Sequence, residues 1–599
     1  MELRPQVKKR YHAPNTAMAI PGAKIEYTVH STESNTRHTD WSNPMKMSRR
    51  SAVQLLAGTG AAMCLPRVFG QASPPATAAA VPTVLPPAPA PIPAPPGFGV
   101  ADGPFKPTLA SLSAFEVPDW YRDAKFGIWA HWGPQSAPET GDWYARNMYI
   151  QGHRQNLYHV KTYGHPSKFG YKDVIPTWKA ENFDPNYLLG LYKKAGAQFF
   201  VSMGVHHDNF DLWNSKHQPR WNAVATGPKK NIAQLFKDAA VKQGLRFGVS
   251  QHLHASYEWM ATCFGSDTTG PLAGVPYDAN DPQYADLYHE KHPLNPNAGD
   301  ISKVPESWKR QYLLRLQDLI DQLQPDLMYH DGVIRFEQYG LNLVAHLYNQ
   351  SAKQNAGKVE AVYTSKGVED CQIGTGVLDF ERGIAQGIWP NPFQTDTCIA
   401  DWHYNRDAKY RTPKQCIDLL VNIVARNGTL LLNFPLKSDG TLDDAEMKIV
   451  SDITAWMAVN AEAIHATRPW LVCGEGPSLA GTIRDTSVFK LLPAIPDNSP
   501  GATRSTGARD TGANLTAQDV RFTAKGKTLY AFLMGWPDKE ALITSLGTAA
   551  KPDPGKIENV ELLGFAGKLQ WTQEATGLRV QMPPAKPCDH AIALKIIRA

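Results

Sequence analysis

Residues 306–332 read ESWKRQYLLRLQDLIDQLQPDLMYHDG, and they contain one complete helix–strand unit. In the first part, apolar side chains recur at the helical period of 3.6 residues; they are Trp308, Tyr312, Leu316, Leu319, Ile320 and Leu323. The short apolar run Leu327–Tyr329 follows and ends in Asp331 and Gly332. The stretch therefore predicts an amphipathic helix over 306–323, followed by a buried strand that places a carboxylate at its C-terminal end.

Short apolar runs that end beside a polar residue recur along the chain. They are Phe126–Ala130 before His131, Phe199–Met203 before His206, Phe247–Ser250 before His252, and Val359–Tyr363. Thr412-Pro413 begins a helix that runs to Arg426, and the buried strand Leu430–Leu432 follows it. Such repetition over about 350 residues predicts an α/β fold, a (β/α)8-type barrel whose active site lies at the C-terminal ends of its strands.

The pattern changes near residue 471, after which no long helical period occurs. Short strands separated by Gly, Pro and Asp follow; they are Val520–Phe522, Thr528–Met534, Val560–Leu563, Leu578–Met582 and Ile592–Ile597. This spacing predicts a small antiparallel β-sandwich over 471–599 behind a catalytic barrel over 105–470. The sandwich either binds sugar or covers the barrel as a structural cap.

Composition excludes several classes of protein. The 599 residues carry 61 Lys plus Arg against 56 Asp plus Glu, a net charge of +5, so no basic surface for nucleic acid is expected. None of the seven Cys forms a CxxC pair, which excludes a zinc ribbon or a thioredoxin-type motif. Outside the N-terminal region no stretch of apolar residues is long enough to span a membrane.

The N-terminal residues have the order of an export signal. Ser48-Arg49-Arg50 precede the apolar segment Ser51–Leu65, and small residues follow at Phe69–Ala72. The paired arginines indicate a bacterial twin-arginine signal within residues 1–72, although a buried helix after chance arginines is the alternative. The next part, 73–104, is a Pro/Ala-rich linker, with ten Pro and seven Ala in 73–97. We therefore expect a periplasmic or secreted protein with no membrane contact after signal removal.

Two carboxylates are candidates for catalysis. Asp331 closes a buried strand before a glycine, and Glu381 lies in the segment Leu378–Gly383. A carboxylate at a buried strand end costs free energy unless it is paired or used, so Asp331 is either functional or a helix cap or ion-pair partner. Two carboxylates from different strand ends are what glycoside hydrolysis needs. Sequence spacing leaves open whether the reaction retains or inverts configuration.

Histidines supply the remaining candidates at strand ends. They are His131, the pair His206-His207, and His252 with His254. A neutral imidazole both donates and accepts hydrogen bonds, which suits sugar hydroxyls. The alternative is a metallohydrolase site made of His252, His254 and Asp331, and any single histidine has a core or surface role as a further alternative.

Together these residues resemble the α-L-fucosidases of glycoside hydrolase family 29. The matching segments, over residues 115–470, are Trp120-Tyr121, Ala124–Gly133, Trp143-Tyr144, His206–Phe210, Pro325–Gly332, Asn427–Asn433, Asp439-Gly440, Asn460–Ile464 and Thr467–Trp470. In the C-terminal part, Val520–Tyr530 and Gly535-Trp536-Pro537 resemble the sandwich that such enzymes append.

The resemblance implies a retaining hydrolase without a metal or other cofactor, acting on terminal α-L-fucosyl residues of oligosaccharides or glycoconjugates. It makes Asp331 the nucleophile, and Glu381 matches the acid/base position by its order in the chain. The sugar contacts that it implies are His131, Asp142, Trp143, His206, His207, His252 and Tyr329.

The chain departs from the family pattern at three places. Val205 replaces a common lysine, Ser250-Gln251-His252 replaces a tyrosine-rich strand end, and no counterpart is found for the arginine that some members carry before the acid/base Glu.

Two other functions stay open. An α-L-galactosidase fits because the two sugars share ring stereochemistry. A non-catalytic glycan-binding barrel is the other, and the presence of both Asp331 and Glu381 argues against it.

Overall fold

The computed structural model describes residues 99–295, 303–367, 370–371, 374–385, 387–479, 508–509 and 515–599. All of these residues belong to one compact unit of the chain. The expected export segment 1–72 and residues 73–98 of the expected linker lie outside the described residues.

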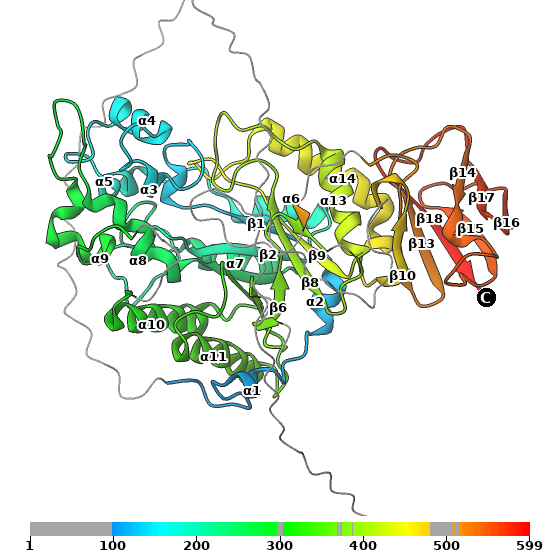
Figure 1. Ribbon diagram of the computed structural model, residues 1–599, viewed down its shortest axis with the longest axis horizontal. Helices are drawn as coiled ribbons and strands as arrows, with labels where there is room; N and C mark the ends of the chain where they lie inside the picture. The colour runs from blue at the N-terminus through cyan, green and yellow to red at the C-terminus, as the bar shows by residue number, and fades with distance from the viewer. Residues whose placement is uncertain are drawn as a thin grey trace, which may run out of the picture. The chain divides into compact units, whose positions relative to one another are not determined.

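A closed barrel of parallel strands forms the larger part of the described chain (Figure 1). In order around the barrel, its strands are β1 (Phe126–Ala130), β2 (Phe199–Val205), β3 (Arg246–Gln251), β4 (Leu327–His330), β5 (Val362–Ser365), β6 (Val377–Asp379), β8 (Phe393–Cys398) and β9 (Gly428–Asn433). The barrel closes where β9 pairs in parallel with β1. The predicted (β/α)8-type barrel is thus confirmed.

Helices connect the strands and cover the barrel. Those described are α1 (Leu109–Leu112), α2 (Asp119–Ala124), α3 (Tyr144–Asn147), α4 (Arg154–Thr162), α5 (Tyr171–Val174), α6 (Pro185–Lys194), α7 (Ile232–Lys242), α8 (Ser256–Trp259), α9 (Ala285–Tyr288), α10 (Glu306–Leu323), α11 (Gln338–Gln354), α13 (Pro413–Val424) and α14 (Asp444–Ile464). Helix α10 has the predicted bounds. The start of α13 follows from its capping box, in which the Thr412 hydroxyl accepts from the Gln415 main-chain nitrogen. Within the described residues, no helix is long and apolar enough to cross a membrane.

The sequence patterns did not predict two of the barrel strands, and they placed the start of a third strand too early. Strand β6 has only three residues, and β8 contains Gln394, Thr395, Asp396 and Thr397, so neither has an apolar run. All of β8 is nevertheless buried, because its polar side chains pair with residues of neighbouring strands. Strand β5 begins at Val362, where pairing with Leu327 of β4 begins, rather than at Val359.

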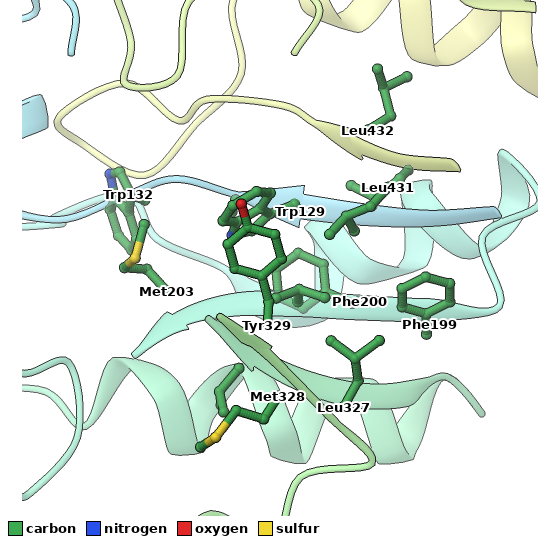
Figure 2. Packing of buried hydrophobic residues seen from close by; sticks show 14 of the residues in the cluster. Trp129, Trp132, Phe199, Phe200, Met203, Leu327, Met328, Tyr329, Leu431 and Leu432 are labelled. Carbon is green, nitrogen blue, oxygen red and sulfur yellow. The ribbon is translucent and has the colours of Figure 1, made fainter. Parts of the chain in front are cut away.

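The barrel interior is apolar below the strand ends. Figure 2 shows Trp129 of β1 against Tyr329 of β4, and their ring centroids are 4.5 Å apart. Trp129 also donates from Nε1 to the Ser250 hydroxyl of β3 at 3.2 Å. This packing places two aromatic rings beneath the strand ends and anchors their polar edges, because a buried indole N–H needs a partner.

The C-terminal part forms two antiparallel sheets. One has the order β10 (Arg468–Glu475), β12 (Val520–Lys525), β13 (Thr528–Leu533), β18 (Ile592–Arg598) and β15 (Ile557–Leu562); the other has β14 (Glu540–Ile543), β17 (Gly577–Gln581) and β16 (Trp571–Glu574). The short strands β7 (Gly383–Ile384) and β11 (Ala508–Arg509) pair separately. The predicted antiparallel domain is confirmed, although β10 starts before residue 471 because it pairs with β12 from Arg468 onward.

Candidate active site

The predicted site residues come from the C-terminal ends of several barrel strands. His131 directly follows β1, His206 and His207 follow β2, and His252 follows β3. Tyr329 lies in β4, with Asp331 just beyond that strand. Because parallel strands all end at the same rim of a barrel, residues far apart in the sequence meet there.

The Asp331 carboxylate is surrounded by hydrogen-bond donors. His252 Nδ1 lies 3.2 Å and His207 Nε2 lies 3.5 Å from its Oδ2, while Lys366 Nζ lies 3.5 Å from Oδ1. The Tyr329 hydroxyl also donates to Oδ1 at 3.5 Å. Burial by itself raises the pKa of Asp331, but the Lys366 ammonium and His252 outweigh it and hold that pKa well below its usual value. Asp331 is therefore an anion, and its side chain is 17% exposed.

Glu381 contacts the same ammonium. Lys366 Nζ lies 2.9 Å from its Oε2, and the side chain is 29% exposed. Burial raises the pKa of Glu381, the attraction of Lys366 opposes that rise, and the Asp396 and Asp331 carboxylates add to it. The two carboxyl groups thus have their pKa values shifted in opposite directions, which is the arrangement that separates a nucleophile from an acid.

Histidine rings line the space beside Asp331. The ligand atoms of His131, His206 and His252 lie within 4.8 Å of one another. Burial, first, and neighbouring imidazoles, second, hold the pKa values of His131 and His206 well below the usual value, so both rings are neutral. Among the described residues, His131 Nδ1 and His252 Nε2 have no hydrogen-bond partner although both are buried. These atoms are suited to hydroxyl groups of a bound molecule.

The Asp142 carboxylate lies at the edge of this histidine group. His403 Nδ1 donates to its Oδ1 at 2.6 Å, and His206 Nε2 lies 3.9 Å from the same oxygen. Gln135 Nε2 donates to His206 Nδ1 at 2.8 Å, which leaves the His206 hydrogen on Nε2. Asp142 is thus fixed by one imidazole and lies near a second.

Aromatic rings lie beside these polar groups. The Trp143 ring lies edge-on to His207 with centroids 6.2 Å apart, and the Trp402 and His131 centroids are 5.0 Å apart. Asn433, at the end of β9, links the main chain at His131 to that at Trp402. Its Oδ1 accepts from the His131 main-chain nitrogen at 2.7 Å, and its Nδ2 donates to the Trp402 carbonyl at 2.9 Å. Apolar ring faces beside polar atoms are typical of sugar-binding pockets.

The structure therefore brings together all nine predicted site residues, while their individual roles stay predictions. His254 lies beside them, with its ring centroid 6.4 Å from that of His207, but its Nδ1 is 3.2 Å from His330 Nε2, and it joins none of the described groups with metal-ligand geometry. Those groups are His131 with His206 and His252, Asp142 with His206 and His403, and His207 with His252 and Asp331. The alternative of a metal site made of His252, His254 and Asp331 is therefore not formed by the described residues, because His254 is absent from the group that contains His252 and Asp331.

Sequence reasoning missed several residues of the site. Lys366 directly follows β5, and its Nζ is within 4 Å of four carboxylates, those of Asp331, Asp379, Glu381 and Asp396. Some family members carry an arginine before the acid/base Glu, whereas in this chain a lysine that directly follows a strand supplies the cation. Asp396 was missed together with its strand, and His403 comes from a loop without a local motif.

Two protein-family models match this chain. A family model described as "Alpha-L-fucosidase" matches residues 98–462, and one described as "Alpha-L-fucosidase C-terminal domain" matches residues 513–597. The chain belongs to the α-L-fucosidase family. That family consists of glycoside hydrolases, and the expected resemblance is confirmed.

Individual members of the α-L-fucosidase family are similar over most of their length. The tissue α-L-fucosidase of Mus musculus is 24% identical over 511 residues, which cover 82% of this chain and 95% of the mouse protein. The plasma α-L-fucosidase of Homo sapiens is 25% identical over 516 residues, or 82% and 92% of the two chains. Among solved structures, the α-fucosidase of Thermotoga maritima matches with a TM-score of 0.60 at 22% identity, covering 82% of this chain and all of that one.

Proposed function

We propose that the protein hydrolyses terminal α-L-fucosyl residues of oligosaccharides or glycoconjugates by a retaining double displacement. The observation that carries the proposal is Lys366, which contacts an ionised Asp331 and a Glu381 of raised pKa at the same time. Family membership supports the fucosyl substrate, and a related structure is described as a complex of the Thermotoga maritima enzyme with fucose.

The separation of the two carboxyl groups supports retention. Their facing oxygens lie 3.5 and 2.9 Å from one nitrogen, so they cannot be farther apart than the sum of these distances. That limit is compatible with the roughly 5–5.5 Å of retaining enzymes.

In the first step, an Asp331 oxygen attacks the anomeric carbon while the bond from that carbon to the leaving oxygen breaks. Glu381 gives its proton to the leaving oxygen, so the aglycone departs as a neutral alcohol. A fucosyl ester on Asp331 and an ionised Glu381 remain. The ester no longer carries the negative charge of Asp331, so the ionised form of Glu381 becomes more favourable than before.

In the second step, Glu381 takes a proton from water while the water oxygen attacks the anomeric carbon. The bond to Asp331 breaks, Asp331 leaves as a carboxylate that Lys366 and His252 stabilise, and Glu381 is protonated again. Two inversions give fucose with the α configuration that the substrate had.

The histidines and Asp142 are proposed to hold the sugar. The unpartnered His131 Nδ1 and His252 Nε2 supply buried positions that a hydroxyl would satisfy, and Asp142 can accept from another hydroxyl. Trp143 supports the sugar's apolar face. In this proposal no step needs a metal ion.

Hydrolysis of an aryl α-L-fucoside, followed by proton NMR in the presence of a chelator, tests the proposal. We expect α-L-fucose to appear first, at an unchanged rate with chelator, and the corresponding aryl α-L-galactoside to react more slowly. Asp331→Asn, which keeps the shape but not the charge, serves as the matched inactive control. β-L-Fucose as the first product would refute retention, a faster galactoside would change the substrate, and loss of activity with chelator would indicate a metallohydrolase.

We also propose export to the periplasm or beyond through the twin-arginine route. The support is the order of Arg49-Arg50, an apolar segment and small residues in the sequence. Replacing both arginines with lysine keeps the charge and should leave the protein in the cytoplasm, as measured by fractionation of cells expressing the full chain. Normal periplasmic recovery of that variant would refute the twin-arginine assignment.

A further inference from the structure

Two buried aspartates lie side by side beneath the proposed catalytic carboxylates. Asp379 ends β6 and Asp396 lies in β8, and these strands are neighbours in the barrel with Asp379 opposite Gln394. Since side chains alternate along a strand, Asp396, two residues after Gln394, is on the same face as Gln394. The side chains of Asp379 and Asp396 are 0% and 1% exposed.

Each aspartate has one oxygen with a donor and one without. Gln394 Nε2 donates to Asp379 Oδ1 at 2.8 Å, and the Tyr329 hydroxyl donates to Asp396 Oδ2 at 2.8 Å. Lys366 Nζ lies 3.4 Å from Oδ2 of each. Within the described residues, Asp379 Oδ2 and Asp396 Oδ1 are buried without a hydrogen-bond partner. One proton between the two carboxyl groups satisfies both oxygens at once.

Electrostatics favours this proton. If all four carboxylates around Lys366 were ionised, one ammonium would face four negative charges in a water-poor site. Burial, first, and the neighbouring Asp396 carboxylate, second, raise the pKa of Asp379 well above its usual value, against the attraction of Lys366. Two adjacent carboxylates commonly hold one proton between them for the same reason.

The partners decide which aspartate keeps its charge. Lys366 Nζ is equally close to both aspartates, but it donates a hydrogen bond to Asp396 Oδ2, which also accepts from the Tyr329 hydroxyl. The Asp396 anion is therefore stabilised by two donors, one of them charged. The hydrogen bond that Asp379 accepts comes from the neutral amide of Gln394. The proton therefore belongs on Asp379, which donates it to Asp396.

We infer that Asp379 is a neutral acid hydrogen-bonded to Asp396, and that Asp396 and Lys366 form a positioning unit without net charge, so that the Asp331 anion holds the proton on Glu381 until the leaving oxygen needs it. The effect on Glu381 rests on its proposed acid/base role, whereas the shared proton does not. Lys366 alone would favour ionised Glu381. The Asp396 anion offsets Lys366, which leaves Glu381 facing the Asp331 anion.

Other titratable groups surround this unit and have to be considered in any test. Three charged groups act on the pKa of Glu381: Lys366 after β5, Asp396 of β8 and Asp331 after β4. Arg382 is the neighbour of Glu381 in the chain. The charge of Asp379 also raises the pKa values of Tyr121 in α2 and of Cys371. The unit and its surroundings are, in full, Tyr121, Tyr329, Asp331, Lys366, Cys371, Asp379, Glu381, Arg382 and Asp396.

A pair of variants separates the shared proton from a structural role. Asp379→Asn has the shape of the protonated acid and keeps a donor for Asp396, so the alkaline limb of the kcat/KM profile should stay where it is in the unsubstituted enzyme. The double variant D379N/D396N has the same shape without the negative charge. Its alkaline limb should move to lower pH by about one unit, since Glu381 then loses its proton more easily. The single variant D396N is less informative, because Asp379 could then ionise in place of Asp396.

Infrared spectroscopy of the full chain supplies a readout that does not depend on activity. In a Glu381→Gln background, the carbonyl band of a buried protonated carboxyl should persist at neutral pH and disappear on adding Asp379→Asn. Persistence of the band would place the proton elsewhere and overturn the inference. It would also be overturned if D379N moved the alkaline limb as far as the double variant, or if the double variant did not move it. An enzyme without fucosidase activity that kept the infrared band would refute the proposed function and leave the shared proton standing.

Discussion

Replacing Lys366 with methionine removes the cation that contacts both proposed catalytic carboxylates. Methionine has a comparable length and no charge, so the change is mainly electrostatic. At the 3.5 Å between Nζ and Asp331 Oδ1, an effective dielectric constant of about 20 gives an attraction of about 5 kcal/mol. His207 and His252 stay in contact with Asp331 and replace part of that attraction, so we expect the pKa of Asp331 to rise by about 1–3 units.

The sign of the pH effect is the same for both carboxyl groups. Activity requires Asp331 ionised and is lost as the pH falls through its pKa, so a higher pKa moves the acid limb of kcat/KM to higher pH. Glu381 loses the attraction that opposes its raised pKa, so its pKa rises further and the alkaline limb also moves to higher pH. The whole bell-shaped profile of Lys366→Met should therefore shift upward.

Lys366→Arg is the matched control because it keeps the positive charge. The profile of the arginine variant should stay near that of the unsubstituted enzyme, even if kcat falls from altered geometry. Removing a buried cation from its partners commonly destabilises a protein by about 3–5 kcal/mol, so circular dichroism and thermal unfolding must accompany the kinetics. A folded Lys366→Met variant whose profile stayed in place, or moved to lower pH, would refute the electrostatic role assigned to Lys366.

Three further substitutions and one control substitution test the proposed roles directly. Asp331→Ala should abolish turnover of good and poor leaving groups alike, and azide should give fucosyl azide of inverted configuration; retained configuration, read by proton NMR, would contradict the nucleophile assignment. Glu381→Ala should lose about 10²–10⁴ in rate on a natural glycan but less on an activated aryl fucoside, with azide giving retained product; a loss independent of the leaving group, without azide rescue, would move the acid/base role elsewhere. His131→Ala should lower kcat/KM by roughly two to three powers of ten, about 3–4 kcal/mol, whereas His254→Ala, which pairs with another histidine, should have a much smaller effect. A loss below about fivefold in folded His131→Ala would place that ring outside the site.

Local sequence patterns predicted the regular elements well where side chains are apolar. Helix α10 has the bounds expected from its 3.6-residue period, and β1 those expected from its apolar run. The pattern failed at β8, whose residues are polar yet fully buried. Burial of Thr395 and Asp396 depends on partners from other strands, which no local pattern contains.

In the candidate site too, some residues carry a local sequence signal and others are identified only by their contacts with other strands. Each of the nine predicted residues carries a local signal, namely a strand end or a segment that resembles the family. Lys366 and Asp396 carry little local signal, and their importance lies in distances to residues from other strands. Glu381 was placed by its order in the chain, and the structure locates it 2.9 Å from the ammonium that also contacts Asp331.

By itself, the sequence determined the kind of fold, the family and the chemical groups available at the strand ends, because periodicity and motifs are properties of neighbouring residues. Only the tertiary structure decided which carboxyl group has its pKa lowered and which has it raised. These shifts depend on burial and on charges a few ångströms away, such as Lys366, which contacts both Asp331 and Glu381. Barrel closure brings these charges together from separate strands, and the energy of each pair falls with distance in space, whatever the separation along the chain.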